Sequence, residues 1–156
     1  MESAPEISAT VHAEIDRLCS TGDADADLGR YPEALGSYWA AWDLLPEPKI
    51  ACREATWILA AIGDVNFLGG NYEAGRDNLC TVMHCPGAIE IPFLHFRLGQ
   101  CLLELGEEER AADELTRACM GGGADLFDDE DPKYLECVER AEAAAAQKKA
   151  WRFWKQ

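Results

Sequence analysis

The chain has 156 residues, of which 48% are hydrophobic, and its 29 acidic and 14 basic residues give a formal net charge of −15 at pH 7. This length suits one domain with a sizeable core, and the abundant Ala, Leu and Glu favour helices with little or no β-structure. A field of this sign repels nucleic acids and membrane surfaces and attracts basic proteins. The charge therefore argues against nucleic-acid binding, although an acidic surface also serves simply to keep a helical protein soluble.

The sequence carries no targeting or membrane signal that we recognise. No apolar run approaches the roughly 18 residues of a membrane helix, and residues 1–6 lack the basic and apolar regions of a signal peptide. The seven cysteines are odd in number and scattered, so they form no disulfide framework and are expected to be small buried hydrophobes. We therefore expect a cytoplasmic protein.

Hydrophobic periodicity predicts helices along the whole chain, with boundaries accurate to about two to four residues. The expected helices span residues 6–21, 24–28 or a longer variant of it, 31–45, 50–69, 72–84, 91–105, 108–121 and 132–150. The run Gly121-Gly122-Gly123 is expected to stop a helix. Asp131 and Pro132 form a start signal, an N-cap oxygen followed by proline at the first helical position. The helix that they open should turn Tyr134, Leu135 and Val138 inward.

Three stretches of the chain repeat a glycine, a second glycine seven residues later and a short run that ends in alanine. The first stretch begins at Gly22, contains Gly29 and ends at Ala34. The second contains Gly63, Gly70 and Ala74 in the same order, and the third contains Gly99, Gly106 and Ala111. The first glycines are spaced 41 and then 36 residues apart, a period typical of helix pairs that stack because one pair cannot bury its apolar face alone. The excess in the longer period lies in residues 47–54 and is expected to lengthen the first helix of the second repeat.

These residues resemble the tetratricopeptide repeat, whose unit is about 34 residues long. The second repeat matches that pattern at Leu59, Ile62, Gly63, Gly70, Tyr72, Leu79, Val82 and Pro86, and the third at Leu98, Gly99, Leu102, Gly106, Ala111, Leu115 and Ala118. Asp25 departs from it, since a core aromatic is usual there. The resemblance implies a single all-α domain over residues 1–156, a right-handed solenoid of helical hairpins. Its three repeats would span 15–123, and a capping helix and tail would span 124–156.

The same resemblance implies a groove lined by fixed positions of each first helix. These are Asp16, Asp23 and Asp27 in the first repeat, Trp57, Asp64, Phe67 and Leu68 in the second, and Phe93, Phe96, Gln100 and Glu104 in the third. Such a groove would be acidic with aromatic anchors, which suits a cationic protein partner. The alternative is that the aromatics are core residues at helical spacing.

Catalytic and metal-binding patterns are weak. None of the three histidines stands in a known nucleophile setting, and His95 is expected to be a packed structural residue. The run from Cys80 to Cys85 lacks the second ligand pair of a structural zinc site. Residues 128–131 lack the alternating ligands and glycine of a calcium loop. We therefore expect no enzyme, no metal and no cofactor.

Residues 148–156 are basic and aromatic, in contrast to the acidic remainder. Trp151 and Trp154 are three apart and share one helix face. Docking of this tail on the acidic body of the same chain is the first expectation, and a dimer contact is the second.

Two functional classes fit these features. Residues 55–64, 92–102 and 131–134 resemble bacterial tetratricopeptide immunity proteins that accompany secreted toxins. That resemblance implies a cognate toxin whose active site or basic surface is occluded. The alternative is similarity to the acidic three-repeat chaperones of type III translocators, which hold an extended partner segment in the groove. The sequence leaves the oligomeric state open.

Overall fold

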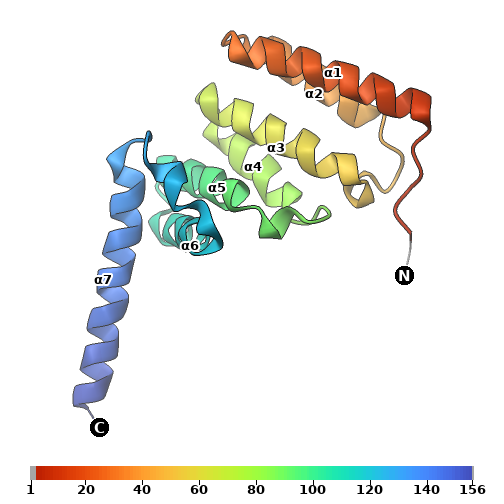
Figure 1. Cartoon of the computed structure of the whole chain (residues 1–156). Coiled ribbons are helices and arrows are strands. Elements are labelled where there is room, and N and C mark those ends of the chain that lie inside the picture. Colours follow the sequence, from red (N-terminus) through yellow and green to blue (C-terminus); the bar gives the residue numbers. More distant parts are fainter. Residues whose placement is uncertain (1–2, 156) are drawn as a thin grey trace. The chain divides into compact units, whose positions relative to one another are not determined.

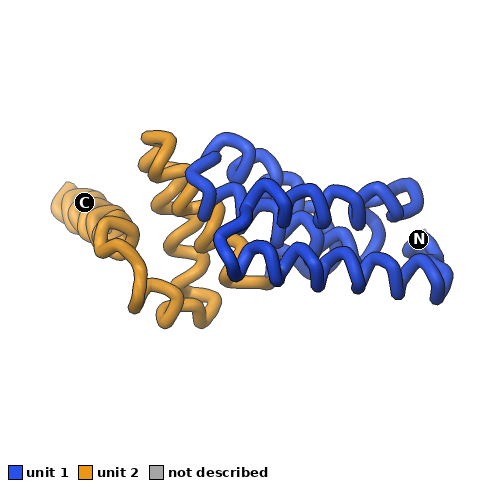
Figure 2. The backbone as a smooth tube through the Cα atoms, turned by 90° about the horizontal axis from the view of Figure 1, so that it is seen from above, with its two compact units in different colours: residues 1–90 blue, residues 91–156 orange. Residues whose placement is uncertain are grey.

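The computed structural model describes residues 3–155, and over that range the protein is helical with no strand. The helices are α1 (Ala9–Asp27), α2 (Tyr31–Asp43), α3 (Arg53–Leu68), α4 (Tyr72–Val82), α5 (Pro92–Glu104), α6 (Glu108–Ala118) and α7 (Pro132–Trp154), as Figure 1 shows. Two compact units, residues 1–90 and 91–156, divide the chain (Figure 2). The first holds the hairpins α1–α2 and α3–α4, and the second holds the hairpin α5–α6 and α7.

Each hairpin closes around the first glycine of its repeat. A Cβ atom on Gly63 would lie 2.5 Å from the Leu79 Cγ, and one on Gly99 would lie 2.6 Å from the Leu115 Cγ. At Gly22 the obstacle is the ring of Tyr38, whose Cε1 would lie 2.6 Å away. Real carbon atoms do not approach this closely, so only glycine lets the two helices of each pair cross at this distance.

The second glycine of each repeat ends the first helix of the pair. Gly29, Gly70 and Gly106 have φ angles of 72°, 79° and 80°, in the left-handed region that glycine adopts without strain. The next backbone N–H then bonds back to a carbonyl five residues earlier, for example from Asn71 to Asn66 over 2.8 Å. This is the Schellman arrangement, which satisfies the free carbonyls at a helix end. The seven-residue spacing of the two glycines is thus the distance from helix crossing to helix end.

The first helix differs from its prediction. The sequence predicts a break near residues 22–23, but α1 runs without interruption from Ala9 to Asp27. Gly22 stands inside the helix because its missing side chain makes room for Tyr38. Asp25, the departure from the repeat pattern, is half-buried and lies 3.3 Å from the Arg30 guanidinium.

The extra residues between the first two repeats do not lengthen α3, which corrects the sequence prediction. They form a 3₁₀ turn, Lys49–Ala51, and α3 begins only at Arg53. The Lys49 ammonium group donates to the carbonyls of Trp42, Asp43 and Leu45 at 3.2, 3.3 and 2.7 Å. The insertion thereby places a positive charge on the free carbonyls at the end of α2, where the helix dipole favours it.

The connection from α6 to α7 contains the predicted stop and start signals. A wide turn over Cys119–Gly123, with Gly122 at φ 89°, comes directly after α6, and a 3₁₀ turn spans Ala124–Phe127. The Asp131 carboxylate accepts the Lys133 N–H over 3.0 Å and caps α7. Tyr134 and Val138 are buried as predicted, but Leu135 is 41% exposed and Cys137 is buried in its stead. The tail is the end of α7 and not a separate segment.

Within residues 3–155, no helix combines the length and apolarity needed to cross a bilayer. All seven cysteines are free thiols, and four of them, Cys52, Cys85, Cys101 and Cys137, are buried.

We predict that Gly63→Ala destabilises the first unit by about 1–3 kcal/mol, because the added methyl group must displace Leu79 or separate α3 from α4. Gly36→Ala is the matched control. Gly36 lies inside α2 with open space around its Cβ position, so alanine there should stabilise by about 0.5–1 kcal/mol. Urea unfolding followed by circular dichroism measures both changes. Equal stability of the two variants would contradict the close crossing.

Candidate protein-binding face

Three positions of each first helix recur at fixed distances from the crossing glycine. They lie six residues before it, one after it and five after it. In α1 they are Asp16, Asp23 and Asp27, in α3 they are Trp57, Asp64 and Leu68, and in α5 they are Phe93, Gln100 and Glu104. Because residues seven and eleven apart share one side of a helix, each set forms a stripe on its helix.

The stripes of α1 and α3 form one surface within the first unit, which we call the α1–α3 face. Asp16, Asp23 and Asp27 are exposed on α1. On α3, Trp57 is 68% exposed and Leu68 is 45% exposed. His12 connects the two helices, since its Nδ1 lies 3.3 Å from the stripe residue Asp16 and its Nε2 lies 3.4 Å from Glu54, near the start of α3. The face combines a row of carboxylates with two apolar side chains.

The centre of the α1–α3 face is organised by the Tyr38 hydroxyl. This hydroxyl donates to the Asp23 carboxylate over 2.6 Å. Burial raises the pKa of Tyr38 well above its ordinary value, and the hydrogen bond to Asp23 and the charge of Asp64 raise it further. The tyrosine therefore stays a donor and holds Asp23 in place. Burial and, after it, the charges of Asp23 and Asp16 likewise raise the pKa of the Cys19 thiol.

Phe67, also predicted to line the groove, has an aromatic neighbour. It is half-buried, and its ring packs against Tyr72 at the start of α4 with the centroids 5.6 Å apart. This contact lies across the turn of the α3–α4 hairpin. Phe67 therefore contributes to the hairpin as well as lying next to Leu68.

In the second unit the corresponding side of α5 is covered by the chain itself. Phe96 is 1% exposed, and its ring packs edge-on against Phe127, with centroids 4.8 Å apart, and against Tyr134 at 6.5 Å. Gln100 is completely buried. These two residues were predicted to line an open groove, and the structure places them instead under residues 127–134. Phe93 is half-buried beside Arg97, whose guanidinium lies 5.2 Å from its ring centroid.

Polar contacts fasten this cover to α5. Arg97 donates to the Gln100 side-chain oxygen over 2.7 Å, and the Gln100 amide donates to Glu130 over 3.1 Å. Neither Arg97 nor Glu130 was singled out from the sequence, because their pairing depends on how the α6–α7 connection folds back.

Glu104, the last stripe position of α5, receives two donors from the start of α7. The Lys133 ammonium lies 2.5 Å from the carboxylate and the Tyr134 hydroxyl donates to it over 2.7 Å. Burial alone would raise the pKa of Glu104, but these two hydrogen bonds and the lysine charge bring it below its ordinary value. The Glu104 carboxylate is therefore ionised and paired near neutral pH.

The histidines and cysteines form no assembled reactive group in the described part of the chain. His95 is buried, and its Nδ1 lies 2.6 Å from the Glu114 carboxylate across the α5–α6 hairpin. Cys85 is buried while His84 is exposed, so the Cys80–Cys85 run does not converge. Among residues 3–155, no three His, Cys, Asp or Glu side chains lie close enough together to hold a metal ion.

No model of a known protein family matches the chain, and no curated protein is similar to it in sequence. Solved structures, however, share its fold. The Yersinia enterocolitica type III secretion chaperone SycD, in complex with a peptide of the translocator YopD, is 18% identical with a TM-score of 0.67, over 90% of this chain and 99% of the other. The first tetratricopeptide domain of human RPAP3 is 15% identical with a TM-score of 0.61, over 87% and 96% of the chains.

The tetratricopeptide domain of Sgt2 from Aspergillus fumigatus is 15% identical with a TM-score of 0.62, over 88% of this chain and 82% of the other. At these identities the likeness concerns the fold. The protein has an all-α, tetratricopeptide-like fold, as its repeated glycines predict.

Two aromatic residues that the sequence assigned to the groove, Phe96 and Trp57, differ in burial, and we therefore expect their replacement to affect stability differently. Phe96→Ala should destabilise the second unit by about 3–5 kcal/mol, because it empties a packed site against Phe127 and Tyr134. Trp57→Ala should change stability by no more than about 0.5 kcal/mol, because the indole is mostly in solvent. Chemical unfolding of both variants measures the difference. A large loss for Trp57→Ala would mean that this indole belongs to the core.

Because Glu104 is ionised and paired, we predict that the protein loses stability in acid. Because its folded pKa lies below the unfolded value of 4.5, its contribution is present above about pH 4.5 and is lost as the pH falls through the folded pKa. Glu104→Gln should lower the free energy of unfolding by about 1–3 kcal/mol at pH 7. Below about pH 4.5 the variant and the wild type should become equally stable. Urea unfolding at a series of pH values measures this. Glu109→Gln, on the exposed side of α6, is the control. A stability difference between Glu104→Gln and wild type that stays the same in acid would contradict the pairing of Glu104.

Proposed function

We propose that this protein is a non-catalytic scaffold that binds an extended, basic and partly apolar segment of another protein along the α1–α3 face. The observation that carries the proposal is the exposure of Trp57 and Leu68 on α3 together with that of the carboxylates of Asp16, Asp23 and Asp27 on α1. Large exposed aromatics supply much buried area at low entropic cost, and surrounding carboxylates select cationic partners and speed their approach.

The second unit contains an example of the contacts that such a stripe makes with a covering segment. There Gln100 and Glu104, two of the three stripe positions of α5, are covered by a short stretch of chain that brings one phenylalanine, one lysine and one tyrosine. The lysine neutralises the stripe carboxylate of Glu104, and the aromatic rings cover Phe96, which lies three residues after the stripe position Phe93. A partner segment with basic and aromatic residues a few positions apart would make the same two kinds of contact with Asp64 or Asp23 and with Trp57.

Chaperoning of a secreted protein is the functional class that this mode of recognition supports. A chaperone holds an unfolded segment by its exposed apolar and charged side chains, and a stripe along two neighbouring helices matches an extended chain better than a folded domain. The chaperone SycD, which has the same fold, is known in complex with a translocator peptide. Here we propose a comparable mode for this chain.

Neutralisation of a toxin, in the manner of an immunity protein, is the second candidate. The net charge of −15 favours it, because an acidic protein complements a basic nucleic-acid-binding cleft. This function requires a folded partner domain and an interface of about 1,600 Å² in total. The two candidates therefore differ in whether a linear peptide is sufficient for binding.

A random peptide library displayed on phage tests the proposal directly. We expect selected peptides to combine Lys or Arg with Leu, Phe or Trp, and to lose binding when their basic residues are replaced by Glu. Trp57→Ala should weaken a selected peptide about tenfold or more, the loss of one central aromatic anchor. Trp39→Ala is the matched control, since Trp39 is 39% exposed but lies on α2, outside the α1–α3 face.

Charge reversal at Asp16 and Asp27 should mainly slow association and reduce its dependence on salt, because both carboxylates are exposed. Stopped-flow fluorescence with a labelled peptide measures this. Peptides that bind Trp57→Ala and wild type equally would refute the assignment of the face. A library that yields no binder, together with inhibition of a folded basic toxin domain, would favour the immunity function.

A further inference from the structure

One side of α7 carries a regular stripe of exposed residues, of which Glu142 also borders a pocket shared with α6. Its members are Leu135, Glu139, Glu142, Ala146, Lys149 and Phe153, spaced alternately four and three residues apart. Such a spacing keeps side chains on one side of a helix and is typical of helices that pair lengthwise. Leu135 is 41% exposed, Phe153 is 79% exposed, and residues 142–150 are exposed throughout.

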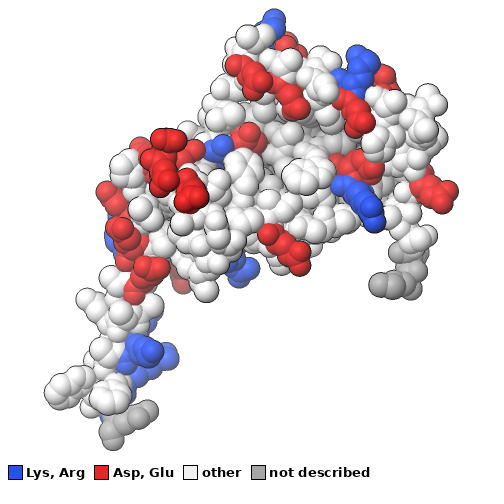
Figure 3. Space-filling model, in the orientation of Figure 1, with Lys and Arg blue, Asp and Glu red and all other residues white. Residues whose placement is uncertain are grey.

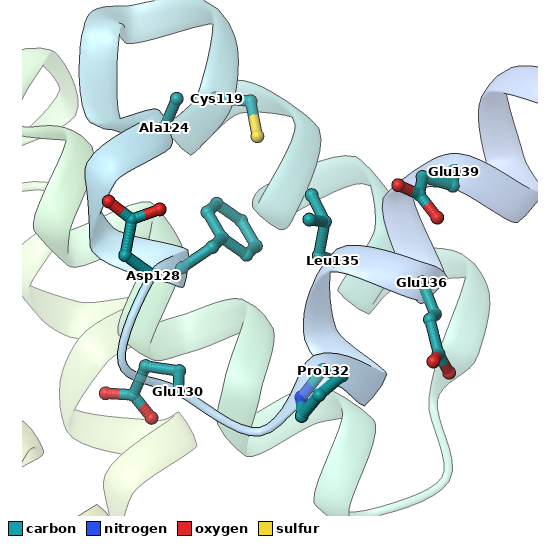
Figure 4. A pocket seen from close by; sticks show the side chains of 9 residues that line it. Cys119, Ala124, Asp128, Glu130, Pro132, Leu135, Glu136 and Glu139 are labelled. Atoms are coloured by element: carbon teal, nitrogen blue, oxygen red, sulfur yellow. The ribbon is translucent and has the colours of Figure 1, made fainter.

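The two ends of this stripe have complementary shapes. At the beginning of α7 lies a pocket of about 610 Å³, with Phe127 and Leu135 among its lining residues (Figure 4). Asp128 and Glu130 border it on one side and Glu136 and Glu139 on the other. At the end of α7, Phe153 and Trp154 project into solvent, 79% and 87% exposed. One end is thus a hollow with an apolar floor, and the other end is an exposed aromatic group.

The two ends also carry opposite charges. Residues 132–142 hold three acidic residues, Glu136, Glu139 and Glu142, and two basic ones, Lys133 and Arg140, whereas residues 148–155 hold four basic residues and no acidic one. Figure 3 shows this separation, with acidic side chains at the start of the helix and basic ones near its free end. Between them lie four consecutive alanines, residues 143–146, whose small side chains let another helix approach closely.

The stripe is symmetric about Ala144. Leu135 and Phe153 are each nine residues from it, Glu139 and Lys149 are each five, and Glu142 and Ala146 are each two. Two copies of α7 laid antiparallel with this centre would therefore match Leu135 with Phe153 and Glu139 with Lys149, twice over. At 1.5 Å per residue the Phe153 of one copy would reach about 14 Å from the centre, level with the pocket beside Leu135 of the other.

We propose that α7 is a self-association surface, through which a second copy of this chain binds antiparallel with two-fold symmetry. Each copy inserts Phe153 into the pocket over Phe127 and Leu135 of the other, and each Lys149 pairs with the Glu139 of the other. A two-fold interface of this kind uses the same patch on both subunits, so both contacts form together. This proposal concerns the second unit only and does not depend on the proposed binding of a partner to the α1–α3 face.

Charge reversal tests the antiparallel match. Lys149→Glu and Glu139→Lys should each weaken the dimer about tenfold or more, because each change turns two attractive pairs into two repulsive ones. An equimolar mixture of the two variants should form a heterodimer, since positions 139 and 149 are then both acidic in one chain and both basic in the other. The double variant E139K/K149E should restore the homodimer. Sedimentation velocity over a range of protein concentrations measures each state.

Lys148→Glu is the matched control, because it makes the same change of charge on the neighbouring residue, about 100° around the helix from Lys149. It should leave the dimer nearly unchanged. Phe153→Ala should also weaken association, and its helical content should equal that of wild type because the ring is exposed. A wild-type protein that stays monomeric at every concentration would overturn the proposal. So would equal effects of Lys148→Glu and Lys149→Glu, or a double variant that fails to dimerise.

Discussion

The close crossing of helices at one glycine per repeat is the constraint on which the remaining structure depends. Because no Cβ atom fits between Gly63 and Leu79 or between Gly99 and Leu115, each pair of helices meets at one fixed point. That point determines which side of the first helix is turned away from its partner. The residues six before, one after and five after the glycine then form the outward stripe, whatever their chemistry. The fold fixes the place of the candidate site, and the side chains at those places give it its character.

The stripes of α3 and α5 have the same geometry and opposite surroundings. On α3, Trp57 is exposed and Leu68 is half in solvent, whereas on α5 the buried Gln100 and the paired Glu104 lie under the α6–α7 connection. The difference comes from the segment that continues the chain after each hairpin. After α6, the turn at Cys119–Gly123 leads into a segment that returns over α5. The second unit thus satisfies its own stripe, whereas Trp57 and Leu68 on the α1–α3 face stay exposed.

The sequence predicted the hairpins well and the site only in part, for a physical reason. Helix crossings and ends depend on single residues, such as Gly70 at φ 79°, which local patterns reveal. The burial of Phe96 depends on Phe127 and Tyr134, which approach it only through tertiary folding. The insertion at residues 47–54 was misread for the same reason, since the bonds of Lys49 to the end of α2 are favourable only once the chain turns there. Local rules locate a surface but do not show what covers it.

The net charge affects the two proposed associations in opposite ways. A field from 15 excess negative charges draws in a basic segment and raises its rate of encounter with the α1–α3 face. The same field opposes the approach of a second copy, so the antiparallel pairing of α7 must rest on short-range contacts, the insertion of Phe153 and the pairs of Glu139 with Lys149. Salt at about 0.1 M screens charges beyond about 10 Å and so reduces the long-range repulsion more than it weakens these close contacts. The same salt slows the association of the basic segment with the α1–α3 face. Raising the ionic strength therefore favours self-association through α7 over binding of the basic segment.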